Sequence, residues 1–153
     1  MRVLVDTNVL LGATFEELPS HAPSVSFLRA LLRSGDRLCL TWVNVYEYLR
    51  VATHARVFSR PLRWNDAKDQ MAALLRHTRT DLLSETPDHL RVLSAVVEGA
   101  GGASGNFVHD CHIATLMSEH DVRTIITADA GFRRFRGLEV LAPEEAEGRL
   151  WPS

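Results

Sequence analysis

MRVLVDTNVLL, residues 1–11, places a carboxylate directly after a short apolar run. Residues 3–5 (VLV) favour a buried strand, and Asp6 follows them before the apolar residues resume at Val9. Removing a carboxylate from water is costly unless something compensates for it. The position of Asp6 at the tip of a strand therefore calls for a reason.

The rest of the chain alternates short apolar runs with longer helical patterns. Strands are expected at residues 2–5, 38–43, 82–83, 124–127 and 138–141. Helices are expected at residues 24–33, 44–53, 66–77, from 86–87 to the glycine-rich GAGGASG loop (99–105), and at 107–119. This alternation predicts an α/β fold, with a parallel sheet of about four to five strands and helices on both faces.

Length and composition are those of an ordinary globular protein. The chain has 153 residues, of which 46% are hydrophobic and 24% charged, so one domain spanning residues 1–153 is expected. No stretch is long enough for a membrane span, and Asp6 interrupts the N-terminal apolar run, so we expect neither a membrane anchor nor a secretory signal. The expected location is the cytoplasm. Two cysteines, Cys39 and Cys111, make neither a disulfide framework nor a zinc quartet.

Four acidic residues stand out by their positions relative to these elements. Asp6 and Asp129 follow the first and fourth strands, and ligand sites of open α/β sheets form outside the carboxyl ends of strands. Helices packed on the sheet can bring Glu47 and Asp110 to the same edge. Taken singly, Asp6 and Asp129 are explained by turns, Glu47 by a capping box with Asn44, and Asp110 by the helix dipole.

Taken together, four clustered carboxylates need a cation. Two such charges about 4 Å apart repel by roughly 4 kcal/mol at an effective dielectric constant near 20. Oxygen ligands of this kind select Mg²⁺ or Mn²⁺ over Zn²⁺. The sequence therefore predicts a divalent-ion site made by Asp6, Glu47, Asp110 and Asp129.

Four segments resemble the PIN-domain ribonucleases, and more narrowly the VapC-like toxins of type II toxin–antitoxin pairs. They are VDTNVLL, VNVYEYLR, HDCHIATL and IITADAGF, which lie within residues 3–132 in the order of the family. The resemblance implies a PIN-like fold and a Mg²⁺- or Mn²⁺-dependent endoribonuclease that leaves a 5′-phosphate and a 3′-hydroxyl. It also implies an RNA substrate, a VapB-like antitoxin and a homodimer.

The resemblance assigns roles to individual residues. Asp6 and Asp110 would bind the ion directly, Glu47 and Asp129 directly or through water, and all four would be catalytic. Asn8 and Thr127 would position these groups or the substrate. Many relatives carry a further acid where this chain has Gly131, which puts a fifth carboxylate and a tightly held second metal in doubt.

Sixteen of the 17 basic residues are arginine, and a planar guanidinium can bind phosphate with paired hydrogen bonds. The net charge is −2, but setting the four acids aside leaves 15 acidic against 17 basic residues. Arg133, Arg134 and Arg136 follow Asp129 and are candidates for contacts with the RNA backbone. Arginines on a solvated surface explain them equally well.

Other functional interpretations have less support. His109 and His112 lie three apart on a helix, but no second ligand pair of recognisable spacing accompanies them, so we expect a partly exposed histidine pair rather than zinc. Trp42, Tyr46 and Leu49 are expected to be core residues rather than a platform for bases. A dehalogenase-type phosphatase would need a second aspartate at position 8 and a late lysine, and a receiver domain also needs that lysine. The main alternative is a non-catalytic PIN-like module that binds RNA or a partner.

Overall fold

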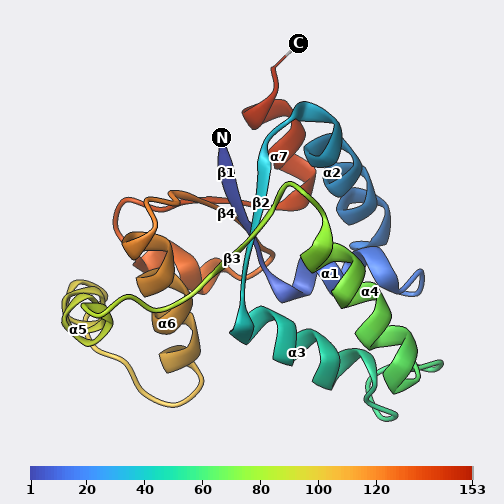
Figure 1. Ribbon diagram of the computed structural model, residues 1–153, viewed down its shortest axis with the longest axis horizontal. Helices are drawn as coiled ribbons and strands as arrows, with labels where there is room; N and C mark the ends of the chain where they lie inside the picture. The colour runs from blue at the N-terminus through green and yellow to red at the C-terminus, as the bar shows by residue number, and fades with distance from the viewer. Residues whose placement is uncertain (153) are drawn as a thin grey trace.

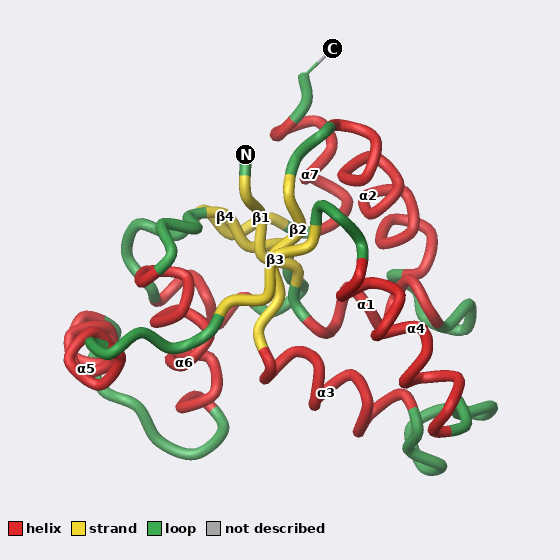
Figure 2. Tube along the Cα trace, in the orientation of Figure 1, coloured by secondary structure: helices red, strands yellow, loops and turns green. Residues whose placement is uncertain are grey.

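The computed structural model describes residues 1–152 and contains a five-stranded parallel sheet (Figures 1 and 2). The strand order is β3-β2-β1-β4-β5, and every neighbouring pair is parallel. The strands are β1 (Arg2–Val5), β2 (Arg37–Thr41), β3 (Thr80–Leu83), β4 (Thr124–Ile126) and β5 (Glu139–Leu141). The predicted α/β fold with a parallel sheet of about four to five strands is confirmed.

Helices cover both faces of this sheet, as predicted. In Figure 1, α5 (His89–Gly99) and α6 (Phe107–Glu119) lie to one side of the sheet, and the short helix η1 (Ala130–Arg134) contacts α6. The other side carries α1 (Thr7–Thr14), α2 (His21–Ser34), α3 (Trp42–Ala52), α4 (Trp64–Arg76) and α7 (Pro143–Leu150). None of these helices, within residues 1–152, combines the length and the apolar character needed to cross a lipid bilayer.

The central strand β1 divides its side chains between the two helical layers. Val3 and Val5 join the apolar cluster that includes Phe27 of α2, whereas Leu4 joins the cluster that includes Met117 of α6. Successive side chains of a strand point to opposite faces, and burial on both faces gives the continuous apolar run seen in the sequence. Val3, Leu4 and Val5 are all fully buried.

Two helices were not expected from the sequence. Helix α1 is apolar around most of its surface because it is buried against other elements, so it lacks the one-sided pattern of a surface helix. Its Gly12 lets α2 approach closely: a Cβ there would lie 2.5 Å from Oγ of Ser24. Helix α7 is mostly charged and packs against α2, with only Pro143 and Ala146 fully buried.

Helix α3 begins two residues earlier than predicted. Thr41 ends β2 and caps the helix, because its hydroxyl accepts from the N–H of Asn44 while the Asn44 amide oxygen accepts from the N–H of Thr41. The capping box therefore joins Thr41 with Asn44, and the alternative in which Asn44 and Glu47 cap the helix is wrong. Glu47 is left free for another purpose.

The strand order reverses direction between β1 and β4. From β1 the chain builds β2 and β3 on one side, and it then crosses to the other side to build β4 and β5. In open parallel sheets, such a switch point leaves a crevice at the carboxyl ends of the two strands. Asp6 follows β1 and Asp129 lies three residues beyond the end of β4, so both are at this crevice.

Candidate active site

Asp6 is a buried carboxylate held by hydrogen bonds from both sides of the crevice. It caps α1, and the N–H of Thr7 donates to its Oδ1 at 2.7 Å. Its Oδ2 accepts from the hydroxyl of Thr127 and from the amide of Asn8, both at 2.6 Å. These hydrogen bonds hold the side chain in one orientation. They also compensate for its burial, since only 6% of the residue is exposed.

Asn8 and Thr127 connect the ends of β1 and β4. The amide nitrogen of Asn8 donates to Oγ1 of Thr127 at 2.9 Å, and the amide oxygen accepts from the N–H of Ala128 at 3.0 Å. Oγ1 of Thr127 also accepts from the N–H of Asp129 at 2.9 Å. These bonds fix Asp6 and the turn carrying Asp129 relative to each other.

The remaining acids come from three different elements. Glu47 lies in the second turn of α3, Asp110 in the first turn of α6, and Asp129 at the start of η1, where its Oδ1 accepts from the N–H of Gly131 at 2.7 Å. These three acids and Asp6 line one cavity of about 1050 Å³. The structure therefore brings the predicted cluster together.

Gly131 leaves room for the side chain of Asp129 in this turn. A Cβ at this position would lie 2.9 Å from Oδ1 of Asp129, so a side chain there would push Asp129 from its present place. The backbone N–H of Gly131 donates to this same oxygen at 2.7 Å.

The pKa values of Asp6 and Asp110 are both raised. Burial is the main cause that raises the pKa of Asp6, and the charges of Glu47 and Asp129 add to it, against the lowering effect of the hydrogen bonds from Thr127 and Thr7. Burial, followed by the charges of Asp129, Asp6 and Glu47, raises the pKa of Asp110 to about 6. Both shifts mean that burial and the neighbouring carboxylates disfavour the ionised form of these two acids.

Cationic side chains do little to neutralise this cluster. Within residues 1–152, the one ion pair made by the four acids is between Glu47 and Arg50, at the long distance of 4.0 Å and with both side chains well exposed. Asp6 and Asp110, whose pKa values are raised, have no such partner among these residues. A divalent ion with oxygen ligands fits this donor set and would supply the missing charge.

Two aromatic side chains stand at the rim of the cavity. Trp42 and Tyr46 line it, with 49% and 70% of each residue exposed and their ring centroids 6.2 Å apart. The prediction that these two residues belong to the core is wrong, whereas Leu49 packs partly buried against it. Trp42 and Tyr46 lie four residues apart on α3, on the face that includes Glu47 and borders the cavity. The opposite face of α3 packs on the protein.

The two histidines of HDCH do not form a pair. His109 lines the acidic cavity, whereas His112 is hydrogen-bonded to Glu85 at 2.9 Å, outside it. Both histidines are partly exposed, as expected, but their side chains have different surroundings.

The three arginines after Asp129 have different surroundings. Arg133 is exposed on η1, and Arg136 lines a separate cavity. The guanidinium of Arg134 lies 3.8 Å above the ring of Phe107 and donates to the carbonyl of Ala100 at 2.9 Å. Arg134 thus holds the glycine-rich loop in place, and its contact with RNA stays a prediction.

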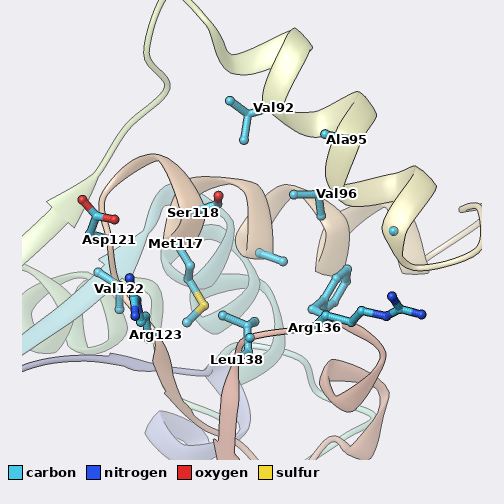
Figure 3. Close-up of a pocket in the computed structure, with 14 residues that line it drawn as sticks. Val92, Ala95, Val96, Met117, Ser118, Asp121, Val122, Arg123, Arg136 and Leu138 are labelled. Carbon is cyan, nitrogen blue, oxygen red and sulfur yellow. The ribbon is translucent and has the colours of Figure 1, made fainter.

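The separate cavity, of about 440 Å³, lies between α5, α6 and the segment leading to β5 (Figure 3). Its lining is largely apolar, with Val92, Val96, Met117 and Leu138, and it includes none of the four acids. The four clustered acids therefore lie at the crevice and not in this second cavity.

Comparison with known proteins gives this arrangement a family. A model of the PIN domain family matches residues 3–138, a span that includes all four acids. The chain belongs to the PIN domain family.

Relatives match nearly the whole chain, and solved structures share its fold. The protein is 34% identical to Ribonuclease VapC37 of Mycobacterium tuberculosis, covering 88% of this chain and 92% of that protein. It is 32% identical to VapC ribonuclease Mb2897 of Mycobacterium bovis, covering 95% and 98%. The fold matches VapBC2 of Rickettsia felis bound to a promoter DNA fragment (TM-score 0.66, 15% identity, 93% and 98% covered) and VapBC-1 of nontypeable Haemophilus influenzae (0.64, 16%, 94% and 98%).

Sequence reasoning missed some residues of this PIN site. Asn44 is fully buried, and its amide nitrogen lies 3.4 Å from both Oδ1 of Asp6 and Oγ1 of Thr7. The signal was available, because an asparagine three residues after Thr41 predicts a cap, but its second contact spans 38 residues of sequence. Arg50 also lines the cavity, and helical spacing from Glu47 would have suggested it.

Proposed function

We propose that this protein is a metal-dependent endoribonuclease that hydrolyses RNA phosphodiester bonds and acts as the toxin of a toxin–antitoxin pair. The observation that carries the proposal is the set of four acids from four elements that line one cavity without adequate cationic partners. The relatives named ribonucleases support it, because they match nearly the full length of the chain. The whole activity is assigned to one PIN domain, residues 1–153.

Mg²⁺ or Mn²⁺ is the cofactor that the donor set favours. The four side chains offer carboxylate oxygens, which are hard ligands suited to these ions. Asp6 and Asp110 would hold the ion directly, with Glu47 and Asp129 acting directly or through water. When bound, such an ion acidifies water and stabilises charge on the leaving oxygen of a phosphodiester.

The protein's own residues prepare this site before any substrate arrives. Thr7, Asn8 and Thr127 fix both oxygens of Asp6, so the carboxylate does not have to be reoriented. Preorganised groups of this kind lower the cost of reaching the transition state. Asp110 has a pKa of about 6, so most of its population is already ionised at neutral pH.

The rim of the cavity supplies contacts for RNA. The exposed rings of Trp42 and Tyr46 offer surfaces on which unpaired bases can stack, and base stacking tolerates any sequence. Arg50 beside them and Arg133 on η1 are exposed cations that can contact phosphates. RNA would therefore run across α3 with its backbone over the acids.

A VapB-like antitoxin is the proposed protein partner, and the toxin is proposed to be a homodimer. The two matched structures named above are described as VapBC proteins, and the one from Rickettsia felis is bound to a promoter DNA fragment. The unneutralised acids suggest how a partner inhibits: an arginine side chain inserted among them can pair bidentately with a carboxylate and exclude the metal. A co-purified complex in which the partner does not contact Asp6, Glu47, Asp110 or Asp129 would contradict this mode of inhibition.

Cleavage of RNA by the purified protein, with chelator or with Mn²⁺, tests the proposed function. We expect cleavage with Mn²⁺, none with chelator, products with 5′-phosphate ends, and no cleavage by a folded Asp6→Asn variant. The alternative, a non-catalytic module that binds RNA or a partner, predicts RNA binding without cleavage in all samples. Cleavage that persists in chelator, or in the variant, would contradict the proposal.

A further inference from the structure

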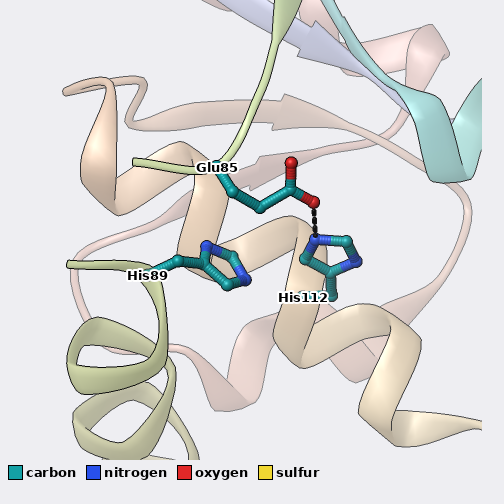
Figure 4. A group of neighbouring side chains, drawn as sticks. All are labelled: Glu85, His89 and His112. Carbon is teal, nitrogen blue, oxygen red and sulfur yellow. Dashed lines mark hydrogen bonds and ion pairs between the residues drawn. The ribbon is translucent and has the colours of Figure 1, made fainter. Parts of the chain in front are cut away.

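A second group of metal-binding side chains lies outside the acidic cavity. Glu85 comes from the loop after β3, His89 is the first residue of α5, and His112 lies on α6. One ligand atom from each residue lies within 4.8 Å of the other two. Figure 4 shows the Glu85 carboxylate and the His89 ring directed toward His112. None of the three lines the acidic cavity.

We propose that Glu85, His89 and His112 form a binding site for one Zn²⁺ ion. Two imidazoles and one carboxylate, with water as a fourth ligand, are a known tetrahedral zinc set. Around such an ion the ligand atoms stand about 3.3 Å apart, given Zn–N and Zn–O lengths near 2.0–2.2 Å. Nε2 of His112 and Oε1 of Glu85 are 2.9 Å apart, so small side-chain rotations create the site.

A buried carboxylate already orients one of the ligands. Nδ1 of His89 is 2.7 Å from Oε2 of Glu119, whose side chain is only 2% exposed. Burial raises the pKa of Glu119, but hydrogen bonds from Thr86 and His89 outweigh it and lower the pKa overall. An ionised Glu119 keeps the proton of His89 on Nδ1 and leaves the Nε2 lone pair facing the cluster. Metal-binding histidines are usually held by a carboxylate in this way.

The ligands are also accessible to an ion. The side chains of His89, His112 and Glu85 are 19%, 29% and 51% exposed, respectively. The imidazole rings of the two histidines meet edge to face, with centroids 5.1 Å apart. For Zn²⁺ to bind Nε2 of a neutral His112, the proton that this nitrogen shares with Glu85 must move to Nδ1 by exchange with solvent, so that the ligand is a neutral imidazole.

A zinc ion at this site would attach α5, a weakly buried helix, to the rest of the molecule. None of the residues of α5 is fully buried, and the helix meets the rest of the molecule chiefly through α6. Zinc bound to His89 and His112 would join the first turn of α5 directly to α6. The imidazole ligands favour Zn²⁺, whereas the carboxylates of the acidic cavity favour Mg²⁺ or Mn²⁺. The two sites can therefore be filled independently.

Calorimetric titration of the full-length protein with Zn²⁺, in a large excess of Mg²⁺, tests this site. We expect one Zn²⁺ per chain. His89→Gln and His112→Gln should each weaken zinc binding by at least about 100-fold, and Glu119→Gln by about 10–100-fold. The matched control is His109→Gln, three residues earlier on the same helix but in the acidic cavity, and it should leave zinc affinity within about twofold.

Hydrogen exchange of α5 gives a second readout. Zinc should slow exchange in the first turns of α5 in the unmodified protein and in His109→Gln, but not in His112→Gln. An unmodified protein that binds no Zn²⁺ in the presence of Mg²⁺ would overturn the proposal. So would zinc binding that survives in His112→Gln and is lost in His109→Gln, because the ion would then lie in the acidic cavity.

Discussion

At the carboxyl end of the sheet the pKa values of Asp6 and Asp110 are raised, whereas near the amino end the pKa of Asp81 is lowered. The pKa values differ in direction because Asp81 has cationic partners. Hydrogen bonds from Arg37 and Arg2, with their charges, stabilise ionised Asp81, and Nε of Arg37 lies 2.9 Å from its Oδ2. No arginine is placed in this way against Asp6 or Asp110 within residues 1–152.

Asp36, just before β2, repeats the arrangement of Asp81. It pairs with the N-terminal ammonium group of Met1 and accepts a hydrogen bond from the indole of Trp151 at 2.8 Å. These bonds outweigh the effect of burial and lower the pKa of Asp36. Acids that serve stability are thus paired inside the chain, whereas Asp6 and Asp110 at the switch point have no cationic partner among residues 1–152, as the proposed divalent-ion site requires. The contrast separates a structural carboxylate from a functional one without reference to any relative.

The largest expected effect is on the rate of RNA cleavage, which should depend on Asp110 at the carboxyl end of the sheet and not on Asp81 near the amino end. Asp110→Asn should lower the rate of RNA cleavage by at least about 100-fold, because loss of a metal ligand should cost no less than loss of the groups that orient one. Asp81→Asn removes the same charge at the other end and should leave the rate within about twofold. The comparison uses initial rates with saturating Mn²⁺ and equal amounts of folded protein. Equal losses in both variants would remove the functional distinction.

RNA affinity should also depend on the carboxyl end. Tyr46→Ala removes an exposed ring at the acidic cavity and should weaken binding of single-stranded RNA by about tenfold, since stacking contributes about 1–3 kcal/mol per base. Trp64→Ala is the control, because Trp64 is 58% exposed but does not line that cavity. Both substitutions would be made in the Asp6→Asn protein, so that the RNA is not cleaved, and fluorescence anisotropy would measure the RNA affinity. Equal losses from the two aromatic substitutions would contradict the assigned stacking role.

Stability should depend on the amino end. Asp81→Asn breaks charged hydrogen bonds to Arg2 and Arg37, which are partly exposed, and should lower the free energy of unfolding by about 1–2 kcal/mol at pH 7. Because the pKa of Asp81 is lowered in the folded state, this contribution exists above pH 4 and disappears as the pH falls through the folded pKa. Urea denaturation at pH 7 measures it. An unchanged midpoint would mean that these pairs do not contribute to stability.

The two ends should show opposite pH dependence. The pKa of Asp110 rises from its ordinary value of 3.8 to about 6, so the folded protein binds this proton more tightly than the unfolded chain. Without metal, ionisation of Asp110 therefore reduces stability progressively between about pH 4 and 6, and the cost is constant above that range. The stability gained by Asp110→Asn should grow over the same interval. Urea denaturation of both proteins with chelator from pH 4 to 7 would show this, and a constant difference would contradict it.

Much of this site could be predicted because its signals are local. An apolar run ending in Asp6 identifies a strand and its tip, and alternation of elements places Asp6 and Asp129 at one edge. The helix expected at residues 107–119 is α6, with the same ends.

What could not be predicted depends on packing between distant segments. Periodicity shows that Trp42 and Tyr46 share a helix face, but only the tertiary structure shows that this face borders the cavity. His112 meets Glu85 and His89 from segments more than 20 residues away, which no spacing rule connects. Helix α1 was missed because burial on all sides removes the pattern that marks a surface helix.

Scanning calorimetry of the unmodified protein and Asp110→Asn, each with chelator and with saturating Mn²⁺, tests most directly whether the clustered acids await a divalent ion. An ion at about 100 times its dissociation constant adds roughly 2.7 kcal/mol, which corresponds to a rise in Tm of about 5–11 °C for a domain of this size. With chelator, Asp110→Asn should be the more stable protein because one repulsive charge is gone, and its response to Mn²⁺ should be smaller. An equal rise in Tm in both proteins would contradict a role for Asp110 in holding the ion.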